Sequence, residues 1–102
     1  MTSAVSFDRY WGTRLSRIEN DCHAMTVVFE LYWTADAKPC GARLRFNGVS
    51  KFDFTAERLF NSDVVELISL EGEVVNSGLR VMGELSNYEF TIICQSVDEK
   101  DI

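Results

Sequence analysis

Apolar and polar residues alternate with a period of two over much of this chain. The clearest run covers residues 23–33 and is rich in β-branched and aromatic side chains. Successive side chains of a strand point to opposite faces, so this pattern predicts a long strand with one buried face. The residues predicted on the first face are Met25, Val27, Phe29, Leu31 and Trp33.

A second alternation follows after a short loop that contains Pro39, which cannot donate to a strand ladder. Two alternating runs joined by a short loop predict an antiparallel hairpin. Its second strand is expected to point Cys40, Ala42, Leu44 and Phe46 inward, and Arg43, Arg45 and Asn47 outward. Pairing residues 23–33 with 40–47 would place Cys40 beside Trp33.

Shorter signals complete the expected elements. Asn47-Gly48 indicates a turn or bulge, and Phe52 with Phe54 indicates a strand just beyond it. Near the C-terminus a tighter hairpin is predicted, with its turn at Ser86-Asn87. Its apolar positions are Leu79, Val81 and Leu85 before the turn, and Tyr88, Phe90, Ile92 and Cys94 after it.

The N-terminal region and one central segment give weaker signals. Residues 13–20 are expected to form a strand, and residues 6–12 one helical turn, with Ser6 as its cap and Gly12 as its stop. The segment 61–73 fits a helix by its spacing and a strand by its β-branched residues, and a strand is slightly favoured.

These elements predict a single mostly-β domain spanning residues 1–102. The expected architecture is an antiparallel meander curled into a sandwich or partly open barrel, with at most one or two short helices. Residues 98–102 are expected to form an acidic tail. No apolar run approaches the ~20 residues needed to cross a bilayer, and the N-terminus lacks a signal-peptide pattern, so a cytoplasmic protein without membrane contact is expected.

The three cysteines, Cys22, Cys40 and Cys94, have no CxxC spacing and favour reduced thiols. In the predicted hairpin Cys22 and Cys40 lie at opposite ends, about 36 Å apart along the strand. A disulfide between them is excluded in that register, because its Cα atoms must lie within ~7 Å. Cys40 and Cys94 are expected to act as small core residues.

Charge divides the chain unevenly. Residues 1–56 hold seven Lys/Arg and six Asp/Glu, whereas residues 57–102 hold three Lys/Arg and ten Asp/Glu. This excess of negative charge argues against a nucleic-acid partner and indicates a basic protein or a cation as the partner. An acidic face is expected from Asp63 and five glutamates, and the five glutamates are the candidate contacts: Glu66, Glu71, Glu73, Glu84 and Glu89.

No pattern indicates catalysis, a metal site or a cofactor. The single histidine, His23, follows Cys22, and neighbours in a strand point to opposite faces, so the pair is interpreted as part of a turn rather than as a ligand or catalytic pair. A P-loop, a dinucleotide-binding motif and a serine-nucleophile motif are all missing from the sequence. A non-enzymatic binding protein without a cofactor is therefore expected.

The aromatic residues allow a different function. Phe7, Tyr10 and Trp11 are interpreted as a plug at one end of the core. The alternative to protein binding is a β barrel that takes a small molecule at an aromatic mouth formed by Trp11, Tyr32 and Trp33. An exposed strand edge could also pair two copies of the chain.

The run Leu44-Arg-Phe-Asn-Gly-Val-Ser-Lys-Phe-Asp-Phe54, placed after a long strand and before an acidic β region, resembles a group of small mostly-β bacterial proteins. Several of these are immunity proteins of polymorphic toxin systems, and others are uncharacterised. The resemblance covers residues 13–97 loosely and carries no catalytic residues. It implies a function in binding and neutralising a cognate toxin, often through an acidic face.

Overall fold

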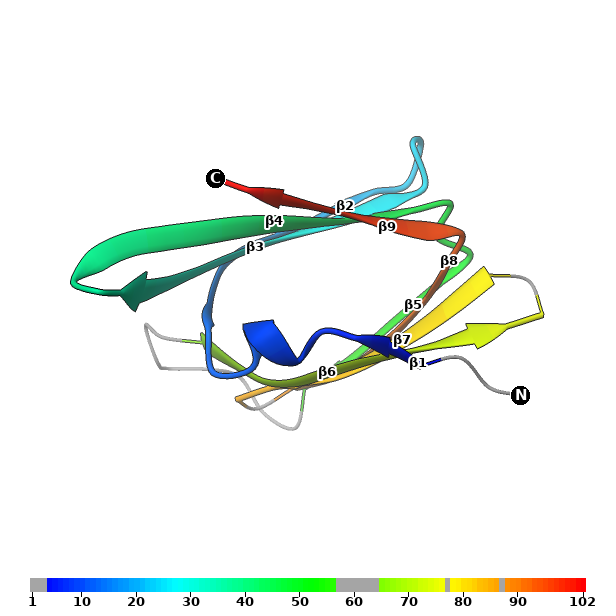
Figure 1. Ribbon diagram of the computed structural model, residues 1–102. Coiled ribbons are helices and arrows are strands. Elements are labelled where there is room, and N and C mark those ends of the chain that lie inside the picture. Colours follow the sequence, from blue (N-terminus) through cyan, green and yellow to red (C-terminus); the bar gives the residue numbers. More distant parts are fainter. Residues whose placement is uncertain (1–3, 57–64, 77, 87) are drawn as a thin grey trace.

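The computed structural model describes residues 4–56, 65–76, 78–86 and 88–102. In this part of the chain nine strands form one antiparallel sheet that folds into two layers (Figure 1). The elements are β1 (Ala4–Ser6), the 3-10 turn η1 (Asp8–Tyr10), β2 (Arg14–Asp21), β3 (Thr26–Ala35), β4 (Lys38–Asn47), β5 (Lys51–Ala56), β6 (Val65–Val75), β7 (Gly78–Leu85), β8 (Tyr88–Cys94) and β9 (Ser96–Asp101). The expected mostly-β fold is confirmed.

The strand order is β5-β8-β7-β6-β2-β3-β4-β9, and β1 pairs with the far end of β6. β5, β8, β7 and β6 form one layer, and β2, β3, β4 and β9 form the other. Between β2 and β6 the ladder is short, with Arg14 opposite Glu66 and Leu15 opposite Val65. The sheet is not closed, because β5 and β9 are its two edges, which matches the predicted sandwich or partly open barrel.

The two layers also meet at a corner where β4 leads into β5 and β8 leads into β9 (Figure 1). Here the Gln95 N–H donates to the Asn47 carbonyl, and the Ser50 N–H donates to the Ile93 carbonyl. Gly48 has a φ of 62°, and a Cβ at this position would lie 2.3 Å from Gln95 Cγ. The turn predicted at Asn47-Gly48 is therefore this corner, and a glycine fits it because it lacks a side chain.

Aromatic rings fill the space between the layers. Phe29 of β3 packs edge to face against Phe46 of β4 at 5.4 Å and against Phe90 of β8 at 5.0 Å, measured between ring centroids. Such pairs stabilise a core beyond the area that they bury. The fully buried side chains that surround them include Val27, Leu31, Leu44, Leu67, Leu70, Val81, Ile92 and Cys94.

The predicted hairpin has the expected register, with Trp33 opposite Cys40. Its first strand begins later than predicted, at Thr26 rather than at residue 23. Met25 has a φ of 55° and is half exposed, because it closes the turn from β2 into β3 instead of joining the buried face. Cys40 is half-buried rather than a core residue, since this end of the hairpin extends past the core (Figure 1).

The predicted helical turn near the N-terminus is a single 3-10 turn, and Gly12 follows it with a φ of 86°. Ser6 is not its cap, because Ser6 ends β1 and Phe7 takes the N-cap position. Phe7 and Tyr10 are buried as the predicted plug requires, but Trp11 is 42% exposed.

The prediction of an acidic tail at residues 98–102 is wrong. Residues 98–101 belong to β9, which pairs with β4 from Ala42 to Asn47. The charged side chains obscured this strand in the sequence, because a sheet edge tolerates a charge density that a central strand does not.

The ambiguous central segment is strand β6 from Val65 onward, as slightly favoured. Residues 61–64, which include Asp63, and residue Asn87 of the predicted turn lie outside the described residues. Among the described residues, no helix has the length and apolar character that crossing a membrane requires.

Candidate functional site

Four of the five predicted contact glutamates share the outer side of one layer. Side chains alternate along each strand, so the exposed residues Arg80, Met82 and Glu84 of β7 point away from the core. The register then aligns outward residues across the strands. The first row contains Ser69, Glu84, Glu89 and Thr55; the second contains Glu71, Met82, Thr91 and Asp53; the third contains Glu73, Arg80, Ile93 and Lys51.

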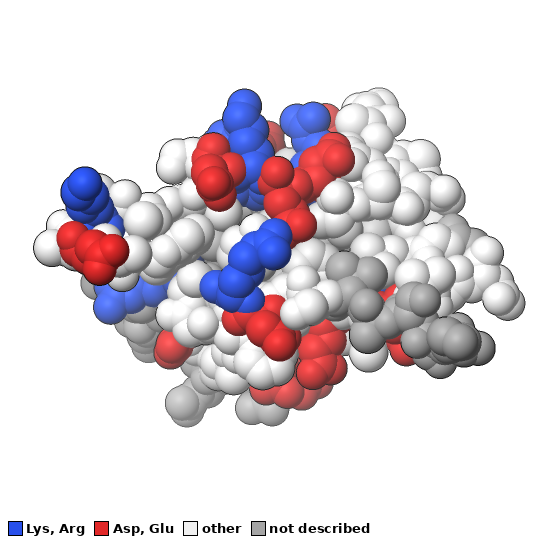
Figure 2. All heavy atoms as spheres, in the orientation of Figure 1, with Lys and Arg blue, Asp and Glu red and all other residues white. Residues whose placement is uncertain are grey.

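We call this surface the acidic face: Glu71 and Glu73 of β6, Glu84 of β7 and Glu89 of β8, with Glu66 at its margin. Glu66 is the second residue of β6, and its N–H donates to the Ser86 hydroxyl at 2.9 Å. In Figure 2 acidic side chains gather along the lower margin of the molecule, on the side where Figure 1 places β6. The structure thus brings together the residues that charge alone had selected.

Most of the carboxylates on the acidic face pair with no cation of the described residues. Glu84 and Glu89 occupy directly opposed positions across the β7–β8 hairpin. Of the face, only Glu73 forms an ion pair among the described residues, with Arg80. Like charges directly opposite each other destabilise a sheet, so the chain carries an unfavourable arrangement here.

The acidic face has an apolar centre that sequence reasoning missed. Met82 is 42% exposed and lies opposite both Glu71 and Thr91. Asp53, from the half of the chain with balanced charge, also points outward here and pairs with Lys51 at 3.2 Å. The alternation of β7 could have identified Met82, because it lies between the outward residues Arg80 and Glu84.

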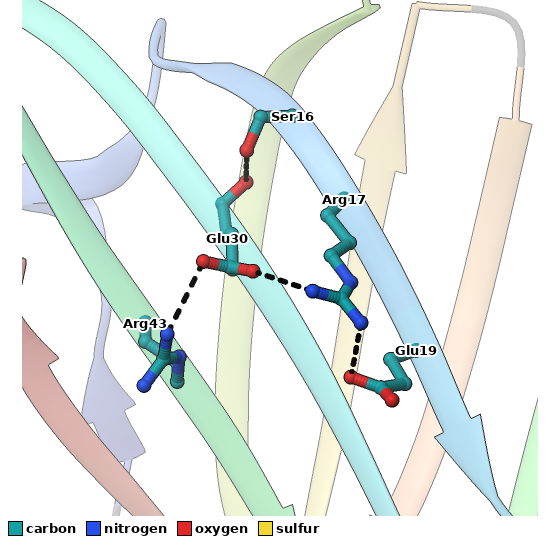
Figure 3. Close-up of polar contacts among 5 residues, drawn as sticks. All are labelled: Ser16, Arg17, Glu19, Glu30 and Arg43. Atoms are coloured by element: carbon teal, nitrogen blue, oxygen red, sulfur yellow. Dashed lines mark hydrogen bonds and ion pairs between the residues drawn. The ribbon is translucent and has the colours of Figure 1, made fainter.

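On the outer side of the other layer, Glu19 and Glu30 form ion pairs with arginines. Glu30 of β3 is 17% exposed at its side chain and lies between two arginines, with Oε1 3.6 Å from Arg17 and Oε2 3.4 Å from Arg43 (Figure 3). Arg17 also reaches Glu19 at 3.0 Å. The Ser16 hydroxyl donates to the Glu30 carbonyl at 3.2 Å.

The two outer surfaces therefore differ in charge organisation. On the outer side of the β2–β3–β4–β9 layer, the carboxylates of Glu19 and Glu30 pair with the guanidinium groups of Arg17 and Arg43 (Figure 3). On the acidic face, Glu66, Glu71, Glu84 and Glu89 form no ion pair within the described residues. Such a surface attracts a basic partner over long range and most strongly at low ionic strength.

The aromatic site predicted as the alternative is only partly assembled. A hollow of about 300 Å³ is lined by Gly12, Arg14, Tyr32, Trp33 and Thr34. Trp11 is not among these lining residues, and its indole N–H donates to the Leu70 carbonyl at 2.9 Å. Trp33 also packs edge to face against Tyr10 at 6.4 Å between centroids. Two of the three predicted residues thus share one surface hollow.

The residues with metal-binding or nucleophilic chemistry lie apart. His23 lies in the turn between β2 and β3, where its backbone N–H donates to the Asp21 carboxylate at 3.0 Å. All three cysteines are free, with Cys22 exposed and Cys94 buried. Burial raises the pKa of the Cys94 thiol. Within the described residues, no group of three or more His, Cys, Asp or Glu side chains could hold a metal ion.

A comparison of the chain with protein-family models and with curated proteins finds no match in either set.

Proposed function

We propose that this protein binds a basic protein partner through the acidic face. One observation carries the proposal: Glu84 and Glu89 face each other and pair with no cation among the described residues, while Glu19 and Glu30 of the opposite layer are paired with arginines. Repulsion between the two carboxylates costs stability in the free protein, and a cationic partner would relieve it. Met82 would supply an apolar contact at the centre of the same surface.

The resemblance of the Leu44–Phe54 run to immunity proteins gives this binding a biological form. We propose that the chain acts in the cytoplasm as an immunity-type inhibitor, which holds a basic toxin and blocks its activity without any cofactor. Because charge complementarity mainly raises the association rate, capture would be fast and would weaken as salt rises.

The test pairs the chain with the product of the gene next to its own, since immunity genes tend to lie beside those of their toxins. Expression of that neighbour alone should arrest growth, and coexpression of the chain should restore it. The Glu84→Lys/Glu89→Lys variant should lose both the rescue and the binding. The Glu19→Lys/Asp98→Lys variant, which has the same charge change on the opposite layer, should keep both.

Circular dichroism and thermal melting of both variants would separate loss of the contact from loss of the fold. If the folded Glu84→Lys/Glu89→Lys variant still binds and rescues, the acidic face is not the contact surface and the proposal fails. A neighbour that neither arrests growth nor binds the chain would reject the immunity role.

A second candidate function rests on the hollow beside Tyr32 and Trp33. Its volume is at the lower end of the range for small-molecule sites, and its lining combines two aromatic rings with one guanidinium group. Binding of a small aromatic carboxylate there should quench tryptophan fluorescence in the Trp11→Phe variant, in which Trp33 is the remaining tryptophan. Unchanged fluorescence across a panel of such compounds would remove this candidate.

A further inference from the structure

The two edges of the sheet differ in how well they are protected. Edge strands expose unpaired backbone groups, and proteins prevent unwanted pairing with charged side chains, above all charges that point inward. β9 is protected in this way. Four of its six residues are charged, namely Asp98, Glu99, Lys100 and Asp101.

Glu99 shows the protection most clearly. It lies opposite the buried residue Leu44 and so points toward the inner side of the layer, where it pairs with Arg9 and accepts a hydrogen bond from the Tyr10 hydroxyl at 2.8 Å. A strand added to β9 would have to pack against Glu99 and Arg9 on the inner side of the layer. β9 is therefore a poor site for pairing.

β5 carries the charged residues Lys51 and Asp53 on its outward side but has no charge that points inward. It pairs with β8 along Lys51–Ala56, and no strand of the described residues pairs with its other side. Its inward residues are aromatic: Phe52 is half-buried, and Phe54 is 39% exposed while it contacts Tyr88 at 4.8 Å between centroids. An edge with uncovered aromatic side chains favours the addition of another strand.

The sequence of β5 complements itself when two copies run antiparallel. With Phe52 opposite Phe52 of a second copy, Lys51 lies opposite Asp53 of that copy, and Asp53 lies opposite its Lys51. The two outward ion pairs would join the pair that Lys51 and Asp53 already form within one chain at 3.2 Å. On the inward side, two phenylalanine rings would meet. Opposite charges and aromatic rings are both favourable cross-strand pairs.

From this self-complementarity we propose that the protein forms a two-fold symmetric homodimer by antiparallel pairing of two β5 edges. The dimer joins the β5–β8–β7–β6 layers of both copies into one continuous sheet, which places two acidic faces on a common surface. In this register only Lys51, Phe52 and Asp53 of each β5 strand lie opposite β5 residues of the second copy. A ladder of three residues is small compared with a standard interface, so association is expected to be no tighter than the micromolar range.

Sedimentation and light scattering at increasing protein concentration test this pairing. The unmodified protein should pass from monomer to dimer. Lys51→Asp and Asp53→Lys each replace two attractive contacts with two repulsive ones, so either substitution should weaken the dimer about tenfold. Both side chains are more than half exposed, so these substitutions leave the core intact.

Mixing the two single variants makes the test specific for contacts between copies. One copy then carries two aspartates and the other two lysines, and every opposed pair in the mixed dimer is attractive. The mixture should therefore dimerise again. Each chain still carries its own two like charges, so only contacts between the two chains can explain the recovery. Lys100→Asp on β9 changes the charge equally and should leave the dimer unchanged.

Three outcomes would overturn the proposal: a monomer at every concentration, a dimer that Lys100→Asp weakens as much as Lys51→Asp does, and single variants that do not recover on mixing. Hydrogen exchange supplies an independent readout, because amides of β5 should gain protection as the dimer forms, whereas amides of β9 should not.

Discussion

Glu84 and Glu89 lie directly opposite each other on the outer side of the β7–β8 hairpin, and no described cation pairs with either carboxylate. A short hairpin would be more stable with an opposite-charge pair at this position. An ion pair on the same surface, between Glu73 of β6 and Arg80 of β7, shows that these strands can hold a compensated pair. The uncompensated position is thus a specific feature of the face that we propose as the binding surface.

Neutralising one of these carboxylates should stabilise the free protein. Glu84→Gln removes the repulsion and should raise the free energy of unfolding by about 0.5 kcal/mol, as measured by urea denaturation at low salt. Partner binding should weaken in the same variant. Glu19→Gln, which removes a carboxylate paired with Arg17, is the control and should give no stabilisation. A loss of stability in Glu84→Gln would show that its carboxylate is not under repulsion.

Glu30 should contribute more to stability than any fully exposed carboxylate on the same layer. Its side chain is 17% exposed and contacts both Arg17 and Arg43 (Figure 3). Glu30→Gln should lower the free energy of unfolding by about 1 kcal/mol, because both contacts weaken in a partly desolvated position. Glu19→Gln should change it far less, since its pair with Arg17 is more than half exposed. Equal losses for the two variants would contradict this ranking, and added salt should reduce the smaller effect first.

The local elements of this fold are readable from the sequence because their signals are local. The alternation in residues 26–33 and 40–46 excludes a one-residue shift, which would turn every apolar side chain outward, and the short loop between the strands then fixes the pairing of Trp33 with Cys40. Cys94 is buried because it continues the alternation of Phe90 and Ile92.

The long-range pairings could not be predicted in this way. β6 pairs with β1, β2 and β7, and nothing in its alternation identifies those partners. β9 carries mostly charged residues, so its sequence resembles a tail more than a strand. Likewise, the acidic residues were selected by charge alone. Their gathering on one face depends on the register of β6, β7 and β8, which also brings Met82 to the centre.

Gly83 is required by the close approach of β7 to the core, and Gly83→Ala should be strongly destabilising. A Cβ at this position would lie 2.4 Å from Phe90 Cζ and 2.9 Å from the Ser69 carbonyl oxygen. The Phe90 ring is held against Phe29 and cannot move away freely. We expect a loss of about 1–3 kcal/mol in the free energy of unfolding, the usual cost of overpacking a core.

A second substitution checks the cause. Phe90→Leu removes the ring atoms that a methyl group at residue 83 would meet, so the double variant should lose less stability than the sum of the two single losses. Strict additivity would mean that the Phe90 ring is not the obstacle at Gly83.

The hydrogen bond from Tyr10 to Glu99 links the N-terminal turn to the last strand, and it should make stability depend on alkaline pH. Burial of the phenol raises the pKa of Tyr10, and the Glu99 carboxylate raises it further. The folded state therefore holds this proton more tightly than the unfolded chain, in which a tyrosine has a pKa of about 10. The resulting stabilisation is fully present below about pH 10 and is lost as the pH rises through the folded pKa.

Thermal melting across the alkaline range should show this decline. Tyr10→Phe should flatten it, whereas Tyr32→Phe, at an exposed position, should keep it. An unchanged alkaline decline in Tyr10→Phe would assign it to another group.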